Sequence, residues 1–262
     1  MNSDQSFKYQ YFKILNLRVN ISTVSNSSAV IEKLIRNSRA SYVCLVNVHL
    51  LVSSMRDKPL YLALNNSNWN FPDGMPIVWY AKKIIKFQMI ERVAGITLME
   101  KCFDKLYDVK HFFYGSTENK LNKVVSIAKR SYPTINIVGS YSPPFRMLTN
   151  NEKKEIISLF NRISPDIIWI ALGAPKQELF MREIASELNS GVMIGVGAAF
   201  DYFIGDITRS PLWLRRLGLE WLCRLCAEPT RLIKRYLITN SLFIVHVLKE
   251  IISDKHSSRK GL

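Results

Sequence analysis

The chain has 262 residues, of which 48% are hydrophobic, and a formal net charge of +15. This hydrophobic content is ample for a buried core and excludes a disordered chain. The positive charge favours an anionic partner such as nucleic acid, anionic lipid or a phosphate-bearing substrate, and charge alone does not choose among them. From Arg209 to the C-terminus, eleven Lys and Arg stand against four Asp and Glu, so nearly half of the excess lies in the last fifth of the chain.

The cysteines and the chain ends bear on the cellular compartment. Four cysteines lie in apolar or helical contexts, which favours a reducing compartment, and the single CxxC has no second pair or nearby histidine that would predict a metal site. The polar N-terminus lacks the apolar stretch of a secretory signal, so we expect a cytoplasmic protein. Residues 236–252 are apolar but interrupted by polar side chains, and a membrane span needs roughly 20 mostly apolar residues. We therefore expect a helix that lies on another surface.

Apolar patterning predicts strands that alternate with helices. In the first half we expect a strand at 12–21, a helix at 27–38, a strand at 42–46, a turn at 68–74 and helices at 75–86 and 96–107. In the second half we expect strands at 110–114, 134–138, 166–172 and 192–196, with helices at 117–131 and 151–163 between them. This alternation predicts an α/β fold with a mostly parallel, Rossmann-like sheet flanked by helices.

The composition divides the chain in two. Residues 1–209 are expected to form a catalytic domain of two lobes, and residues 210–262 a basic helical appendage. In the appendage, Trp213, Trp221 and several leucines interleave with arginines at helical spacing, which is typical of a helix lying in a membrane interface. Trp221 and Leu225 can equally be buried against the catalytic domain, so core packing stays open as the alternative.

Polar residues gather where the predicted strands end. Gly173–Glu178 turns the chain into a helix, for which Pro175 suits the first position, and Gly195–Asp201 follows the next strand. In open α/β sheets, ligands bind beyond the carboxyl ends of the strands, where helix N-termini favour phosphate. We therefore expect an anionic ligand here.

Three residues in the first half have two interpretations each. Asn47, at the end of a strand, can bind a ligand or cap the next helix. Asp73, before Gly74, is most often a turn residue, although a positioned carboxylate can also act as a general base. Arg92 can form a surface pair with Glu91 or contact a substrate.

Several segments resemble the WecG/TagA/CpsF glycosyltransferases, glycosyltransferase family 26, over about residues 14–236. The similar segments are 73–74, 91–95, 173–178, 197–201, 205, 209–211, 218–221 and 228–231. The chain departs from the family pattern at Leu45, where a hydroxyl residue is usual, at Ser116, where a second glycine is usual, and at Lys234, where arginine is common.

The resemblance implies an inverting enzyme that moves a hexose or N-acetylhexosamine from a UDP-sugar to a polyprenyl-diphosphate-linked saccharide in cell-surface polysaccharide assembly. It implies that Asp73 is the general base and that the other site residues bind substrates. Those residues are Asn47, Arg92, Gln177, Asp201, Arg209, Arg224, Arg231 and Lys234. No Asp-x-Asp motif is present, so we expect basic residues and helix N-termini, with no metal and no cofactor, to stabilise the departing diphosphate.

The expected location is the cytoplasmic face of the membrane, with an anionic lipid surface as a partner and a homo-oligomer left open. Two other functions are weighed against this one. The net charge permits a basic nucleic-acid-binding protein, although no recognised nucleic-acid module is visible, so no nucleic acid is expected as a partner. The glycines from Gly195 to Gly197 half resemble a dinucleotide fingerprint, which leaves a nucleotide-sugar oxidoreductase as the other alternative.

Overall fold

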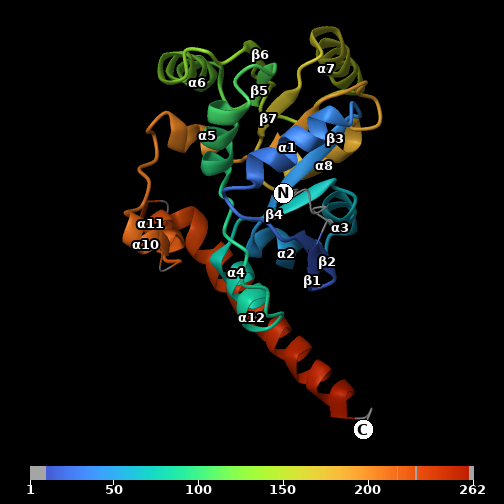
Figure 1. The fold of residues 1–262 in the computed structure, drawn as a ribbon, viewed down its shortest axis with the longest axis vertical. Helices are drawn as coiled ribbons and strands as arrows, with labels where there is room; N and C mark the ends of the chain where they lie inside the picture. Colours follow the sequence, from blue (N-terminus) through green and yellow to red (C-terminus); the bar gives the residue numbers. More distant parts are fainter. Residues whose placement is uncertain (1–9, 217, 228, 260–262) are drawn as a thin grey trace, which may run out of the picture.

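The computed structural model describes residues 10–216, 218–227 and 229–259, and it is built around one all-parallel sheet (Figure 1). Its six strands are β3 (Ser41–Val46), β4 (Trp69–Pro72), β5 (His111–Gly115), β6 (Ile137–Tyr141), β7 (Ile167–Ala171) and β8 (Val192–Gly195). They lie in the order β4-β3-β8-β7-β5-β6. The predicted parallel α/β fold is confirmed, and the division of its catalytic part into two lobes stays a prediction.

Helices cover both faces of the sheet. The helices before the C-terminal segment are α1 (Ser27–Arg36), α2 (Val48–Ser54), α3 (Lys58–Asn65), α4 (Met75–Lys83), α5 (Gly95–Lys105), α6 (Glu118–Ser131), α7 (Asn150–Ile163), α8 (Lys176–Ile184) and α9 (Ala199–Phe203). Along β3, Tyr42 and Cys44 pack into the core with α2, α3, α7 and α8, whereas Val43 and Leu45 pack into the core with α1, α5 and α6. This alternation is the period of two of a strand buried on both sides.

The first predicted strand, 12–21, is wrong as a single element. The chain reverses at Leu15 and Asn16, which have φ of 49° and 63°, so the segment forms a hairpin of β1 (Tyr11–Ile14) and β2 (Leu17–Asn20). Asn is among the residues that tolerate this left-handed conformation. The hairpin lies outside the six-stranded sheet, beside β4, where the Asn20 side chain accepts a hydrogen bond from the Asn70 backbone. No βα unit therefore opens the sheet.

Other differences from the predicted elements concern boundaries. The predicted turn at 68–74 contains strand β4, α4 ends at Lys83, and β6 runs from Ile137 to Tyr141, beyond the expected 134–138. Pro175 precedes α8 and is not its first residue. Helix α2 is the helix that Asn47 was expected to cap, and α3 was not predicted, although it begins after Asp57, whose side chain accepts a backbone N–H of the first turn.

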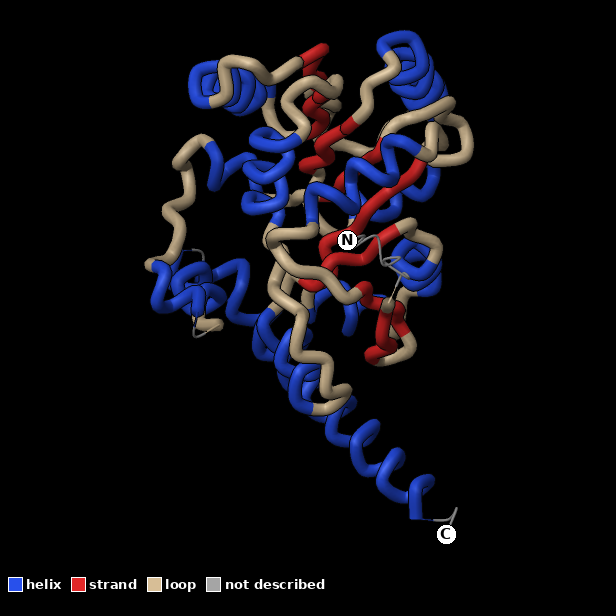
Figure 2. Tube along the Cα trace, viewed as in Figure 1, coloured by secondary structure: helices blue, strands red, loops and turns tan. Residues whose placement is uncertain are grey.

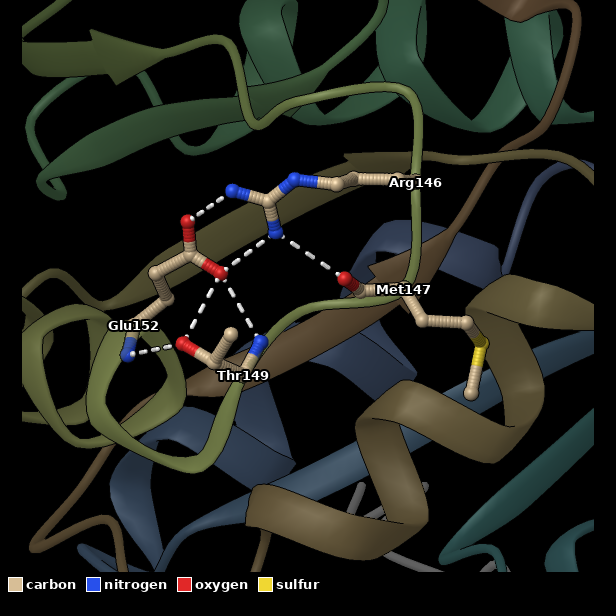
Figure 3. A network of polar contacts seen from close by, with 4 residues as sticks. All are labelled: Arg146, Met147, Thr149 and Glu152. Carbon is tan, nitrogen blue, oxygen red and sulfur yellow. Dashed lines mark hydrogen bonds and ion pairs between the residues drawn. The ribbon is translucent and has the colours of Figure 1, made fainter.

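A polar network orders the loop between β6 and α7 (Figure 3). Thr149 caps α7, whose first residue is Asn150, and forms a capping box with Glu152. Both terminal nitrogens of Arg146 donate to the Glu152 carboxylate, at 2.6 and 2.8 Å. The same loop carries the exposed side chains of Phe145 and Met147.

The C-terminal segment forms α10 (Leu212–Arg216), α11 (Glu220–Ala227) and α12 (Pro229–Arg259). Helix α12 packs along α2, with Leu232, Thr239 and Phe243 buried, and its C-terminal end extends away from the body of the protein (Figures 1 and 2). Among the residues that the structure describes, no helix is both long and apolar enough to span a bilayer.

Candidate active site

The ends of β3 and β4 bring Asn47 and Asp73 to the same edge of the sheet. Val46 and Pro72 pair in register, and the backbone N–H of Asp73 donates to the carbonyl of Val46 over 2.8 Å. The Asn47 side chain accepts a hydrogen bond from the backbone of Leu50 at 3.1 Å, so its capping interpretation is confirmed. A role of Asn47 in ligand binding stays a prediction.

Arg92 lies against Asp73. The segment that carries it is fixed on β4 because Val93 donates a backbone hydrogen bond to the carbonyl of Pro72. Nε of Arg92 donates to Oδ1 of Asp73 over 3.2 Å. The side chain of Arg92 is 23% exposed and that of Asp73 is 21% exposed. Glu91 points elsewhere and accepts from the backbone of Val24 at 2.9 Å. The surface pair between Glu91 and Arg92 is therefore not formed.

Arg92 has a second carboxylate partner, Glu220, the first residue of α11. Nη1 of Arg92 donates to Oε2 of Glu220, whose side chain is 14% exposed. Burial lowers the pKa of Arg92, but Asp73 and Glu220 together more than offset it and raise that pKa above its usual value. The guanidinium therefore stays charged. Sequence reasoning missed Glu220, although it lies within the 218–221 segment that resembles the family pattern.

Gln177 belongs to the same edge of the sheet but is engaged within the protein. It is buried, its Oε1 accepts from the backbone of Gly197 at 3.1 Å, and its Nε2 donates to Glu178 at 2.8 Å. A Cβ at Gly195 would lie 2.8 Å from Cε of Met181 and 3.0 Å from that Nε2, so a larger residue would require these side chains to shift. Gln177 thus ties the turn after β8 to the start of α8, and substrate binding by its side chain stays a prediction.

Asp201 is held by a lysine that sequence reasoning missed. Lys120 of α6 forms an ion pair with Asp201 and a second one with Asp206, at 3.2 Å. The hydrogen bond that Lys120 donates to Asp201 is the main cause that raises the pKa of Lys120, and Asp206 adds to it. No short motif could have found this pair, because Lys120 and Asp201 are 81 residues apart.

Of the four predicted basic residues of the C-terminal part, the structure describes the side chain of Arg209. Arg209 donates to both oxygens of Glu100, at 3.1 and 3.2 Å, and to Thr97 at 3.0 Å, so it anchors the chain on α5 ahead of the appendage. Arg224 belongs to α11, and Arg231 and Lys234 belong to α12. The side chains of these three residues lie outside the described part of the structure.

The arrangement places one carboxylate, Asp73, at the carboxyl ends of parallel strands with a charged guanidinium fixed beside it. A carboxylate so placed can take a proton from a hydroxyl group. Within the described residues, no group of three or more His, Cys, Asp or Glu side chains lies close enough together to hold a metal ion.

Comparison with known proteins gives one family. The model of the glycosyl transferase WecG/TagA/CpsF family matches residues 12–257. The N-acetylglucosaminyldiphosphoundecaprenol N-acetyl-beta-D-mannosaminyltransferase of Bacillus subtilis (strain 168) is 30% identical over 210 residues, which cover 79% of each chain. The protein of the same name from Bacillus spizizenii is 28% identical over 214 residues, which cover 81% of this chain and 80% of the relative.

Proposed function

The chain belongs to the WecG/TagA/CpsF family of glycosyl transferases, and we propose that it transfers N-acetylmannosamine or a related hexosamine from a UDP-sugar to a polyprenyl-diphosphate-linked N-acetylglucosamine. The chain is thus a glycosyltransferase of lipid-linked polysaccharide biosynthesis, which leaves the nucleic-acid-binding and oxidoreductase alternatives without support. The names of the two relatives support this sugar and this acceptor. The placement of Asp73 beside Arg92 at the ends of β3 and β4 carries the proposal.

In the proposed reaction, an acceptor hydroxyl oxygen attacks the anomeric carbon of the donor sugar. The bond from that carbon to the UDP oxygen breaks, UDP leaves with the bond electrons, and the hydroxyl proton passes to Asp73. A single displacement of this kind inverts the anomeric configuration. Arg92 is close enough to Asp73 to hold the carboxylate in one orientation.

The leaving diphosphate gains negative charge, which positioned cations and helix N-termini stabilise. We assign this role to Arg224 of α11 and to Arg231 and Lys234 of α12. Glu100 and Thr97 engage the guanidinium of Arg209, and substrate binding by this residue stays a prediction. Gln177 and Asp201 are proposed to lie beside the bound UDP-sugar, where Gln177 orders the turn after β8 and Asp201 is held by Lys120.

The appendage, residues 210–262, is proposed to place the enzyme on the cytoplasmic face of the membrane. One side of α12 is buried on α2, and the opposite side exposes Leu237, Ile244, Leu248 and Ile252, which recur at helical spacing. An exposed apolar stripe on a basic segment suits an anionic lipid surface. Trp221 packs edge to face on Tyr236 of α12, within the appendage, and is still 40% exposed, so part of its ring is open to lipid.

A transfer assay tests the function. The purified chain is incubated with a panel of UDP-sugars and a polyprenyl-diphosphate-linked N-acetylglucosamine, and the lipid product is identified by mass. We expect UDP release and addition of one N-acetylhexosamine with UDP-N-acetylmannosamine. Transfer that requires another nucleotide, or hydrolysis of the donor without a lipid product, would contradict the proposal.

A further inference from the structure

We infer that Lys120 is a positioning residue for the donor: it fixes the Asp201 side chain beside the nucleotide of the bound UDP-sugar and balances the charge of the neighbouring Asp206. This inference rests on the proposed function, because it takes Asp201 to be one of the residues that contact the donor. It gives a part in donor binding to α6, a helix in which sequence analysis placed no site residue.

Lys120 and Asp201 stand at the carboxyl ends of two strands that flank β7. Lys120 is in the first turn of α6, which follows β5, and Asp201 is in α9, which follows β8. The helices after β5 and β7 leave toward opposite faces of the sheet, since α6 and α8 pack into different cores. In open α/β sheets, ligands bind where neighbouring strands diverge in this way. The pair therefore lies where a donor nucleotide is expected.

One ammonium group is shared between two carboxylates. Nζ of Lys120 donates to Oδ1 of Asp201 and lies 3.2 Å from Oδ2 of Asp206. The three side chains are between 27% and 36% exposed, so solvent screens their charges only in part. These contacts raise the pKa of Lys120, chiefly through the hydrogen bond to Asp201, so the ammonium stays charged.

The backbone after α9 brings the second carboxylate to this place. Helix α9 ends at Phe203, and Gly205 follows with a φ of 81°, a left-handed conformation that glycine adopts without strain. The backbone N–H of Ile207 then donates to the carbonyl of Asp201 over 3.1 Å, which closes the turn. Asp206 is thereby held next to Asp201, and the two like charges repel each other when no cation lies between them.

The position of α9 does not depend on this ion pair. Phe200 is buried and packs edge to face on an aromatic ring of β5, and Phe203 packs edge to face on a ring of α5. Loss of the Lys120 charge should therefore leave the helix in place and release only the side chain of Asp201.

The chemistry explains why the carboxylate needs a cation beside it. A carboxylate accepts hydrogen bonds from the hydroxyl and N–H groups of a nucleoside, but its charge repels the diphosphate of the same molecule. Lys120 holds Asp201 in one orientation and lowers the negative charge that the diphosphate meets. Affinity for the nucleotide should therefore depend on Lys120 even though Lys120 acts through Asp201.

The test is Lys120→Met in the full chain, because methionine fills much of the same space without a charge. We expect the Kd for UDP, measured by calorimetry, and the KM for UDP-N-acetylmannosamine to rise about 10-fold, as for the loss of one hydrogen bond to a charged group. The KM for the lipid acceptor and kcat at saturating donor should stay near the parental values. Lys120→Gln takes its place if the Met variant does not fold.

Two further variants frame this comparison. Lys120→Arg keeps the charge and should recover most of the UDP affinity. The matched control is Lys123→Met, which removes the charge of an exposed lysine on the same helix and should match the parent.

A double variant tests whether Lys120 acts through Asp201. Asp201→Asn alone should weaken UDP binding by a similar factor, and Lys120→Met should add little in that background, because residues that act as one unit are not additive. Two losses that simply add would overturn the inference, since Lys120 would then contact the donor directly.

The inference also fails if Lys120→Met binds UDP like the parent, or if Lys120→Arg does not recover the lost affinity. A Met variant with a lower Tm and unchanged UDP affinity would leave Lys120 a purely structural role. Failure of the proposed function is a different result, because the parent itself would then transfer no N-acetylhexosamine to the lipid.

Discussion

Arg92 donates a hydrogen bond to Asp73 across 3.2 Å, from the segment that connects α4 to α5. The contact converts a turn aspartate into a carboxylate with a fixed orientation and a charged neighbour. A turn aspartate alone would accept hydrogen bonds from its own backbone. The pairing with Arg92 therefore favours the catalytic interpretation of Asp73 over the turn interpretation.

Asp73→Asn should keep the fold and donor binding and remove most of the transfer activity. The amide keeps the shape and an oxygen for Arg92 but cannot take up the acceptor proton. Loss of one general base lowers a rate on the order of 10²–10⁴-fold. Single-turnover transfer and UDP affinity are the measurements.

Asp57→Asn is the matched control, because asparagine caps a helix as well as aspartate does at the start of α3. An Asp73→Asn variant that matches the parent would leave Asp73 as a turn residue.

Transfer should proceed in excess EDTA. The sequence has no Asp-x-Asp motif, and it carries an excess of basic residues in the appendage. We expect these cations to meet the charge of the departing diphosphate in place of a divalent metal. Initial rates are measured with chelator, and again after magnesium or manganese is added back. Loss of activity in EDTA that either metal restores would show that a metal takes part.

The parallel sheet could be predicted because its strands are short apolar runs between turn residues. The hairpin could not, since its reversal at Leu15 and Asn16 contains neither Gly nor Pro. The bounds of α2 and α3 were missed because both helices are short: α2 begins two residues after the end of β3, and α3 follows α2 after three residues. Their signals were the caps at Asn47 and Asp57.

The candidate site was predictable in part. Asp73 and Arg92 lie in segments that resemble the family pattern, so sequence alone singled them out. The partners that fix the site were not predictable, because Glu220 lies 128 positions from Arg92 and Lys120 lies 81 positions from Asp201. Only the packing of the appendage on α4 and of α6 beside α9 brings these charges together.

Stability should depend on Glu152 at acid pH. Its hydrogen bonds from Arg146, followed by that from the Thr149 backbone, lower the pKa of its carboxyl to about 2. A lowered pKa means that the stabilisation is present above the unfolded value of about 4.3 and is lost as pH falls toward 2. Urea midpoints at pH 7 and pH 3 should therefore differ less for Glu152→Gln than for the parent. Glu155→Gln on the same helix is the control, and equal differences for all three proteins would contradict the prediction.

The exposed side of α12 should bind membranes. Replacing Leu237, Ile244 and Leu248 together by serine removes apolar side chains that face away from α2, so the packing of Leu232 and Phe243 is kept. We expect the variant to fold and to lose sedimentation with anionic vesicles, because interfacial helices bind through buried apolar area and basic charge. The rate of transfer to a vesicle-bound acceptor should fall together with vesicle binding, while the rate with a short-chain, water-soluble acceptor stays at the parental value.

The control is Met55→Ser, which replaces an exposed apolar side chain at the C-cap of α2. Undiminished sedimentation of the triple variant would show that this side of α12 does not meet the lipid.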